Sequence, residues 1–344
     1  MRYTVVIPSR YASTRLPGKP LLDIMGKPMV VRVAEQALKG GAERVIVATD
    51  DTRIRDAVLA SGVNVEVCMT SPDHNSGTER IAEVVNAVKL GDQEIVINVQ
   101  GDEPLIPPEN IAQVADLLEC SQAPMATLCA RVTGEDVFDP NCVKVVINYQ
   151  GDALYFSRAP IPYERNSFRA GDMSAPRGHA RHIGIYAYRV GFIRKYMTLP
   201  PCEIEALESL EQLRVLYHGY RIAVTYAETD PLLGVDTAED LERVRRDGAV
   251  AEEKSSNLGK QFESFKLTWS LLQDYWAGEY RNVPWKLLAS IGFAVTYLVS
   301  PLDIIPDFLP IIGFVDDAAV FALVVSSFQS ELDTYKEWKR NRQK

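Results

Sequence analysis

Cations cluster just after the first apolar stretch of the chain. The β-branched run 5–7 stops at Pro8, and Arg10, Arg15 and Lys19 then occupy a segment rich in Ser, Thr and Gly. A parallel strand that delivers such a loop typically presents a phosphate-binding site at its carboxyl end. With a net charge of −9 over the whole chain, these cations favour one small polyanionic ligand over a long nucleic acid. Neither GxxxxGK[ST] nor GxGxxG is present there, and the alternative is a surface loop with scattered charges.

Carboxylates follow a second buried strand. The apolar run 95–99 is followed by Gln100, Gly101, Asp102 and Glu103, at the sheet edge where α/β proteins bind ligands. A carboxylate at this edge suits Mg²⁺ held against phosphates. The alternative for Asp102 is a turn aspartate bonded to nearby amides. Because the cationic loop is expected at the same edge, we favour the metal role.

Other candidates lie where helices begin. Ser76 or Thr78 suits the N-cap of a helix predicted over 76–88, and the free amides of that first turn also suit a ligand. Asp236 or Thr237 suits the N-cap of a later helix, so capping is a strong alternative to any role of Asp236 in chemistry.

One strand and one helix carry further polar residues. Alternation along 182–189 places His182 and Tyr186 on one face, which suits a sugar pocket or, alternatively, a tyrosine-lined core. No cysteine or third histidine accompanies His179 and His182, so we expect no zinc site. A single helix is predicted over 203–217. Its core face is predicted to consist of Leu207, Leu210, Leu213 and Leu216, with Glu208, Glu211 and Gln212 on a solvated face.

The order of elements indicates the fold class. Helix patterns such as 29–38 alternate with strands such as 45–49, which is typical of a parallel α/β sheet. The segments 143–148 and 153–158 read as a hairpin, so the sheet is expected to be mixed.

Bulk properties set the class of protein. The length of 344 residues suits two domains, and the 47% hydrophobic and 24% charged fractions are those of a soluble globular protein. Five scattered cysteines without CxxC and the lack of a signal-peptide pattern predict reduced thiols and a cytoplasmic location. The acidic balance argues against general nucleic-acid binding.

Many motifs of residues 1–247 occur in the order found in one family. They are VIPSRYASTRLPGKPL, VATDD, SGTERIAEVV, VNVQGDEPLIP, VKVV, ALYFSRAPIP, HIGIYAYR, LESLEQLR and GVDTAEDLERV. In these the chain resembles the CMP-Kdo synthetase family, the 3-deoxy-manno-octulosonate cytidylyltransferases. The resemblance implies a Rossmann-like, GT-A-like nucleotidyltransferase sheet, a homodimer, Mg²⁺, and transfer of CMP from CTP to Kdo with release of pyrophosphate. The motifs do not distinguish Kdo from an analogue such as 8-amino-Kdo.

The resemblance also implies roles for individual residues. The triphosphate would be held by Arg10, Arg15 and Lys19. Cytosine and ribose would be contacted by Ser76, Gly77 and Gln100. Mg²⁺ would be held by Asp102 and Asp236. The sugar acid would be bound by Arg158, His182, Tyr186, Glu211 and Gln212. Because the set Arg10, Lys19, Asp102 and Asp236 is intact, we favour an enzyme over a regulatory binding protein that has kept the nucleotide fold.

The C-terminal part is a separate addition. Residues 248–261 are predicted as a linker, and 262–344 as an all-α module with helix patterns at 262–276, 285–299 and 318–338. Its YxxxPxDxIPD…GxxDD pattern over 297–317 resembles a small helical family of uncharacterised function. The aspartates of that pattern suit helix capping better than metal binding.

The apolar run 287–302 of this module is shorter than a membrane-spanning helix requires. With basic residues near the C-terminus, this composition predicts peripheral contact of 285–344 with an anionic membrane, packing of the helices on each other, or docking of a partner.

Overall fold

The computed structural model describes residues 2–12, 16–74, 76–132, 134–169, 178–231, 234–288 and 328–342. The chain divides into two compact units, Met1–Gly248 and Ala249–Lys344. The predicted division into 1–247, a linker 248–261 and a module 262–344 stays a prediction. Arg15 and the aspartates of the 297–317 pattern lie outside the described residues, so their predicted roles stay predictions.

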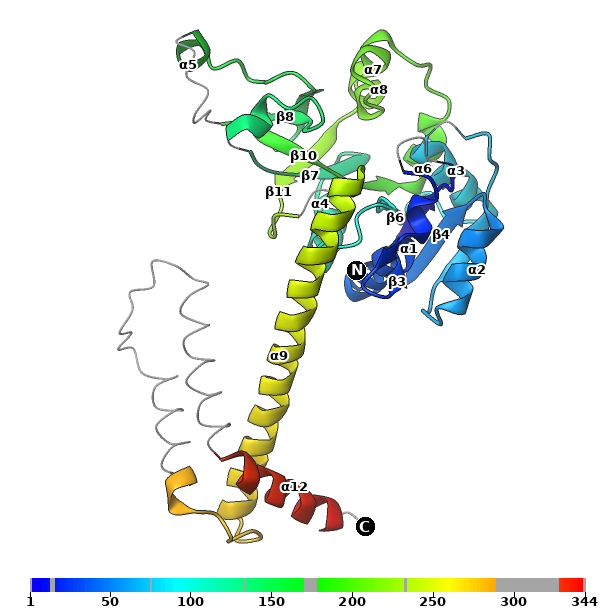
Figure 1. Cartoon of the computed structure of the whole chain (residues 1–344). Helices are drawn as coiled ribbons and strands as arrows, with labels where there is room; N and C mark the ends of the chain where they lie inside the picture. Colours follow the sequence, from blue (N-terminus) through cyan, green and yellow to red (C-terminus); the bar gives the residue numbers. More distant parts are fainter. Residues whose placement is uncertain are drawn as a thin grey trace. The chain divides into compact units, whose positions relative to one another are not determined.

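A mixed sheet forms the centre of the first unit (Figure 1). Its main strands lie in the order β11 (Ile222–Tyr226), β7 (Met125–Arg131), β10 (Ala180–Arg189), β6 (Ile95–Asn98), β1 (Thr4–Ser9), β4 (Arg44–Thr49) and β5 (Glu66–Met69). β10 runs antiparallel to β6 and β7, and the other neighbouring pairs are parallel. The hairpin of β8 (Lys144–Ile147) and β9 (Ala153–Ser157) pairs with β10. The predicted mixed, mostly parallel sheet is confirmed.

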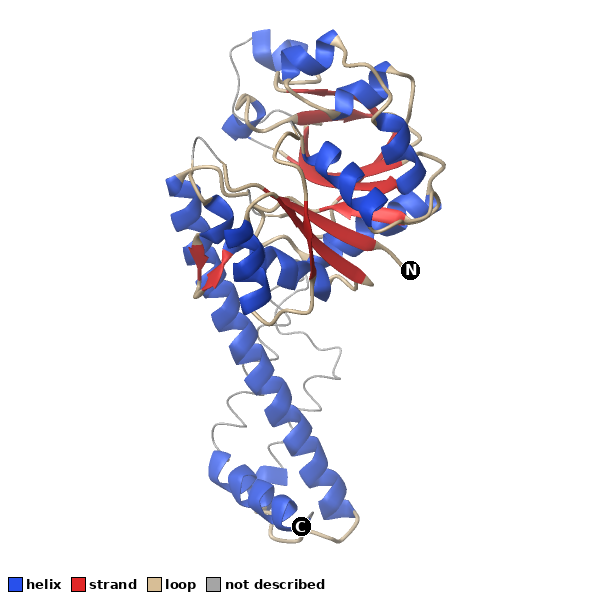
Figure 2. Ribbon diagram, turned by 90° about the vertical axis from the view of Figure 1, so that its right-hand side faces the viewer, coloured by secondary structure: helices blue, strands red, loops and turns tan. Residues whose placement is uncertain are grey.

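Helices cover both faces of this sheet (Figure 2). On one face, Val5 and Ile7 of β1 pack with residues of α1 (Met29–Lys39), α2 (Thr52–Ala60) and α4 (Pro108–Cys120). On the other face, Val6 of β1 packs with residues of α3 (Gly77–Ala87), α6 (Val190–Tyr196) and α8 (Gln212–Tyr217). Successive side chains of a strand point to opposite faces, so a strand buried on both sides is apolar throughout. This is why β1, β4 and β6 were recognisable as short apolar runs.

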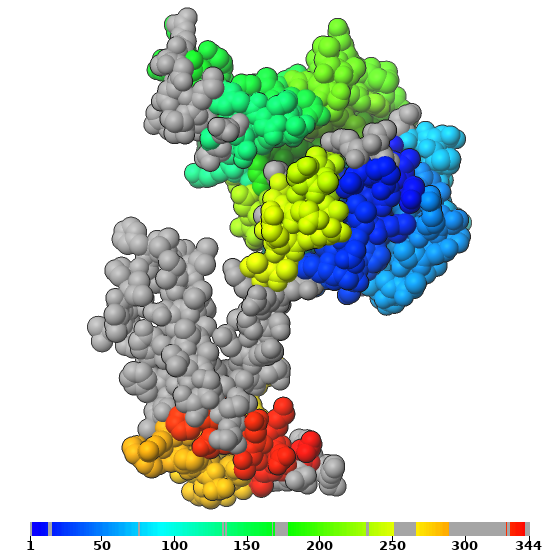
Figure 3. Space-filling view, in the orientation of Figure 1, coloured from blue at the N-terminus to red at the C-terminus, as the bar shows by residue number. Residues whose placement is uncertain are grey.

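The remaining short elements of the first unit are η1 (Lys19–Leu21), β2 (Asp23–Ile24), β3 (Lys27–Pro28), η2 (Gly134–Val137), α5 (Arg165–Arg169) and α7 (Glu203–Glu208). A smaller core forms where Ile24 and Met29 pack against Leu241 and Val244, near the start of the helix that begins at Ala238. Figure 3 shows this contact as the yellow surface lying against the dark blue one.

The prediction of a single helix over 203–217 is wrong, because two short helices occupy this segment. Ser209 has a left-handed backbone with φ 52°, which ends α7 and lets α8 start in a new direction. As a result Leu207, predicted to face the core, is 76% exposed, whereas Gln212, predicted to face solvent, is 5% exposed. The Glu208 carboxylate fixes this break, because it accepts hydrogen bonds from the Ser157 hydroxyl at 2.6 Å and the Arg158 amide at 2.9 Å.

The helix α9 (Ala238–Trp276) runs through the predicted linker 248–261 without interruption, so the pattern at 262–276 is only its last part. In the second unit, Leu271 and Leu287 form a small core with Leu332 of α12 (Gln329–Arg342). Among the described helices, none combines the length and the apolar composition needed to cross a bilayer.

Candidate functional site

Lys19 joins the two carboxylates that the sequence singled out. Its ammonium lies 2.6 Å from Asp102 Oδ2 and 3.1 Å from Asp236 Oδ1. Lys19 follows Gly18, whose φ of 67° turns the chain into η1, while Asp102 follows β6 and Asp236 precedes α9. Three segments far apart in the sequence therefore place one cation and two anions together at one edge of the sheet.

Backbone contacts hold these segments in place. The Val235 amide donates to the Asp102 carbonyl at 2.9 Å, which couples the two carboxylate-bearing loops. A side chain at Gly101 would meet the Pro8 carbonyl and the Ser9 hydroxyl at 2.7 Å, so the end of β6 approaches β1 closely. At this position only glycine fits.

The Asp236 carboxylate is not the helix cap. The Thr237 hydroxyl accepts from the Asp240 amide at 3.2 Å, and Asp240 Oδ2 accepts from the amides of Asp236 and Thr237. This reciprocal arrangement is a capping box, and it satisfies the first turn of α9 without the Asp236 side chain. Asp236 reaches Lys19 instead, so the capping alternative for its carboxylate is wrong.

A polar cavity of about 270 Å³ lies in the same unit. It is lined by residues predicted to contact the nucleotide and by residues predicted to contact the sugar. They are Arg10, Gly77, Gln100, His182, Tyr186, Glu211 and Gln212. Two predicted sets that lie far apart in the sequence thus face one space. Gln100, which lines the cavity, is two residues from Asp102. The same loop therefore serves the cavity and the Lys19 cluster, formed by Lys19, Asp102 and Asp236.

Glu211, which lines this cavity, is hydrogen-bonded to the Ser76 side chain. The Ser76 hydroxyl caps α3 by accepting from the Glu79 amide at 3.2 Å, so the capping prediction is confirmed. Burial raises the pKa of the Glu211 carboxyl, although hydrogen bonds with Thr78 and Ser76 oppose this shift. Glu211, predicted to be on a solvated face, is therefore a partly desolvated acceptor.

His182 is held as a neutral ring. Burial, assisted by the charge of Arg181, lowers its pKa to about 3. Its Nε2 lies 3.0 Å from the Thr127 hydroxyl, whose single proton is directed to the carbonyls of Ile185 at 2.6 Å and Ile183 at 3.1 Å. The hydroxyl oxygen therefore accepts from Nε2–H, and Nδ1 of the neutral ring carries the lone pair.

This burial predicts an acid-sensitive fold. The unfolded chain protonates His182 below its ordinary pKa of about 6.5, whereas the folded chain does not until about pH 3. The contribution of the neutral His182 ring to the free energy of unfolding is complete above pH 6.5 and is lost as the pH falls toward 3. Replacement His182→Gln should therefore reduce the loss of unfolding free energy between pH 7 and pH 5 by about 1–2 kcal/mol. Denaturant titrations at both pH values measure this loss of unfolding free energy. An equal loss in wild type and His182→Gln would contradict a buried, neutral His182 ring.

Arg158 does not line the cavity. Its guanidinium donates to the main-chain carbonyls of Glu208 at 2.7 Å and Pro140 at 2.8 Å, with a longer contact of 3.5 Å to Ser209. It thus fixes the turn between α7 and α8, which carries Glu211 and Gln212 toward the cavity. The direct contact to the sugar acid predicted for Arg158 stays a prediction.

Two buried polar atoms of the cavity lack a partner within the described part of the chain. They are Oδ1 of Asn98 and Nε2 of Gln212, on residues that are 3% and 5% exposed. Buried polar groups are nearly always hydrogen-bonded, so an acceptor and a donor kept in this state favour a polar ligand. Asn98 was missed by the sequence analysis, although it is the polar residue inside the apolar strand β6.

The donor set around Lys19 fits a hard cation. Asp102 and Asp236 supply carboxylate oxygens, which Mg²⁺ prefers, and substrate phosphates and water commonly complete its shell. No group of three or more His, Cys, Asp or Glu side chains suited to a metal occurs among the residues described. Burial and the charge of Asp102 raise the pKa of the neighbouring Glu103 to about 8, so it adds little negative charge at neutral pH.

Comparisons with known proteins match two parts of the chain to two families. Residues 4–222 match the family model described as cytidylyltransferase, and residues 287–323 match a protein family of unknown function, DUF1232. The second match confirms the resemblance stated for 297–317.

The chain is 58% identical over 247 residues to a 3-deoxy-manno-octulosonate cytidylyltransferase of Vibrio vulnificus, covering 72% of this chain and 98% of the relative. It is 57% identical over 246 residues to that of Serratia proteamaculans, covering 71% and 98%. A solved structure of CMP:2-keto-3-deoxy-manno-octonic acid synthetase complexed with CTP is 44% identical, covers 74% of this chain and 100% of its own, and has a TM-score of 0.66. Through its N-terminal unit, the chain therefore belongs to the 3-deoxy-manno-octulosonate cytidylyltransferase, or CMP-Kdo synthetase, family.

Proposed function

We propose that this protein transfers CMP from CTP to the anomeric hydroxyl of Kdo, or of a close analogue such as 8-amino-Kdo, and supplies the product for lipopolysaccharide synthesis. The observation that carries the proposal is the meeting of Lys19, Asp102 and Asp236 beside a cavity with polar atoms still to be satisfied. Family membership supports the same reaction.

The reaction is an in-line displacement. The anomeric oxygen forms a bond to the α-phosphorus of CTP, the bond from that phosphorus to the pyrophosphate oxygen breaks, and the hydroxyl proton leaves to solvent. Arg10 and Lys19 neutralise the triphosphate, and Arg15 is proposed to join them. Such a transfer depends on positioning and charge stabilisation more than on a covalent nucleophile.

Mg²⁺ is proposed to be held by Asp102 and Asp236. When bound, it supplies positive charge to the phosphates and lowers the pKa of the attacking hydroxyl. Before Mg²⁺ binds, the Lys19 ammonium neutralises the same two carboxylates. The chain's own residues therefore keep the site assembled without a large excess of negative charge.

The cavity orients the sugar and the nucleotide. The neutral His182 ring presents Nδ1 as an acceptor, and the amide Nε2 of Gln212 is a donor without a protein partner in the described structure. Ser76, Gly77 and Gln100 are proposed to contact cytosine and ribose, and Tyr186 and Glu211 the sugar. Arg158 supports this set by holding the α7–α8 turn.

Pyrophosphate release with CTP and Mg²⁺ tests the proposal, with Kdo, 8-amino-Kdo or no sugar as the acceptor. Release that depends on one of the sugars supports the reaction and identifies the acceptor. Absence of release with both sugars would contradict the proposal.

We also propose a cytoplasmic homodimer. The described cysteines are all free thiols, as expected in a reducing compartment. The β8–β9 hairpin exposes Tyr149 fully and Leu154 by 58%, which favours a second copy of the chain against it. Sedimentation equilibrium distinguishes a dimer from a monomer.

The C-terminal unit is proposed to touch an anionic membrane surface through 285–344 and the adjoining end of α9. Trp269 and Trp276 lie seven residues apart on α9 and are 49% and 72% exposed, and Trp285 is 73% exposed. Tryptophan prefers the membrane interface, and the exposed Lys286 suits anionic headgroups.

Flotation of the full-length protein with liposomes tests this contact. Binding to vesicles containing anionic lipid, but not to zwitterionic vesicles, is expected, and the double replacement Trp276→Ala with Trp285→Ala should lower it several-fold. Equal recovery of both proteins in the unbound fraction would contradict the contact.

A further inference from the structure

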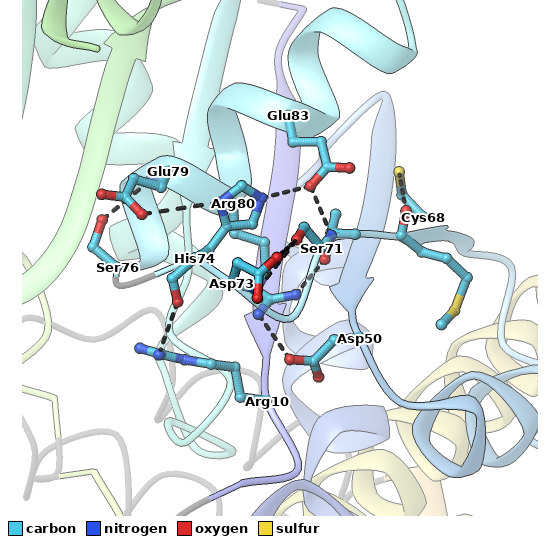
Figure 4. A network of polar contacts seen from close by, with 12 residues as sticks. Arg10, Asp50, Cys68, Ser71, Asp73, His74, Ser76, Glu79, Arg80 and Glu83 are labelled. Atoms are coloured by element: carbon cyan, nitrogen blue, oxygen red, sulfur yellow. Dashed lines mark hydrogen bonds and ion pairs between the residues drawn. The ribbon is translucent and has the colours of Figure 1, made fainter.

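One carboxylate oxygen ties down the segment that leads from β5 into α3. The parallel ladder of β5 ends where the Thr70 amide donates to the Thr49 carbonyl at 2.8 Å. Beyond it, Glu83 Oε2 accepts from the Ser71 amide at 2.9 Å and contacts His74 Nε2 at 2.5 Å (Figure 4). The two ends of the turn 71–74 are thus bound to a single atom of α3.

The His74 ring lies between two carboxylates of that helix. Its Nδ1 is 3.9 Å from Glu79 Oε2, and Glu79 and Glu83 share one face of α3 because they are four residues apart. Burial opposes ionisation of Glu83, but the Ser71 amide and the His74 ring outweigh it and hold the pKa of this carboxyl below its usual range. Glu83 is therefore an ionised, strong acceptor for the ring at neutral pH.

The backbone of His74 reaches the candidate site. Its carbonyl accepts a hydrogen bond from Arg10 Nη1 at 3.3 Å, and Arg10 lines the cavity. Gly77, a few residues later, lines the same cavity. The direction of the Arg10 guanidinium thus depends on where the turn 71–74 presents this carbonyl.

A separate set of contacts anchors the base of the segment. The fully buried Arg80 pairs with Asp50 Oδ2 at 3.0 Å and hydrogen-bonds to the Thr70 hydroxyl. These contacts do not involve His74, so they should keep α3 and β5 packed when the ring is removed. In Figure 4 the His74–Glu83 contact lies above these contacts, and the His74 carbonyl is directed down toward Arg10.

We infer that His74 is a positioning residue for the nucleotide: through Glu83 it holds the carbonyl that orients Arg10 and thereby sets the affinity for the triphosphate. This inference rests on the proposed function. It assigns to the His74 side chain an effect on CTP that requires no contact between the ring and the nucleotide.

The test measures the dissociation constant for CTP by calorimetry, together with KM for both substrates. His74→Ala should weaken CTP binding about tenfold, the effect of losing one charge-assisted hydrogen bond, and change KM for the sugar less than twofold. His74→Gln, whose amide is able to donate to Glu83, should recover much of the affinity. The double variant His74→Ala with Glu83→Ala should be no weaker than the weaker single variant, because both remove the same contact.

A matched control removes an ion pair that does not touch this turn. Glu66 lies on β5 and pairs with Arg44 at 2.8 Å on the exposed sheet edge. Glu66→Gln should leave the affinity for CTP unchanged, and the melting temperatures of Glu66→Gln and His74→Ala should fall by similar small amounts.

Three results would overturn the inference: unchanged CTP binding in His74→Ala, equal losses for both substrates, or a loss that His74→Gln does not reduce. Wild-type protein that binds CTP but transfers no CMP would instead count against the proposed function. Because calorimetry needs no turnover, the two failures are distinguishable.

Discussion

Asp102→Asn is expected to lower kcat for pyrophosphate release by about 10²–10³-fold, the loss typical when one electrostatic stabiliser of a transition state is removed. Asp102 is the closer of the two carboxylates on Lys19, and its loop is coupled to that of Asp236 through the Val235 amide. The amide keeps the shape of the side chain but removes its charge. The Mg²⁺ concentration needed for half-maximal rate should therefore rise by tenfold or more, while binding of CTP persists.

Asp92→Asn is the matched control for this change. Asp92 is an aspartate paired with Arg194 of α6, remote in the sequence from the Lys19 cluster, and it does not line the cavity. Its replacement should leave both kcat and the Mg²⁺ dependence unchanged. If Asp102→Asn kept more than a tenth of the wild-type rate, the carboxylate would have no part in the reaction. Turnover lost with CTP binding retained would also separate catalysis from a purely regulatory binding role.

Lys19→Met is expected to lower kcat/KM for CTP by about 10²–10³-fold, because it removes a cation that we propose neutralises the triphosphate. It also leaves the carboxylates of Asp102 and Asp236 without the ammonium that now lies 2.6 Å and 3.1 Å from them. Without metal, the variant should melt about 4 °C lower than wild type, the shift that about 1–2 kcal/mol produces in a domain of this size.

Mg²⁺ should restore the melting temperature of Lys19→Met more than it raises that of the wild type, since the proposed metal would replace the lost positive charge between the carboxylates. Thermal unfolding with and without Mg²⁺ measures this difference. Lys19→Arg is the charge-conserving control and should keep the melting temperature but lose part of the activity, because a planar guanidinium does not reproduce the geometry of the ammonium. A metal effect equal in all these proteins would show that Asp102 and Asp236 do not form one cation site.

Local sequence patterns were sufficient to predict much of the fold and the part of the candidate site formed by Lys19 and Asp102. The strands β1, β4 and β6 are buried on both faces, so their apolar runs are legible without any tertiary information. Lys19 and Asp102 follow two of those strands, and parallel strands present their carboxyl ends at one sheet edge. Spacing therefore sufficed to predict that these residues serve one polyanionic ligand.

The helix pattern over 203–217 was less informative. A period of 3.6 residues assigns faces only while the helix is continuous, and the left-handed Ser209 interrupts it. The break exposes Leu207 and turns Glu211 and Gln212 into the cavity. The contacts that cause it come from Arg158 and from the Ser157–Glu208 hydrogen bond, residues some fifty positions apart along the chain.

The sequence by itself determined the order of the elements, the sheet edge that carries the candidate site and, through its motifs, the family. Only the tertiary structure decided which polar residues are partners: Asp236 with Lys19 rather than with its own helix, Arg158 with carbonyls rather than with the cavity, and Asn98 as a buried acceptor. The reason is physical. Periodicity and capping depend on neighbours along the chain, whereas hydrogen-bond partners and desolvation depend on segments that the sheet brings together from distant positions.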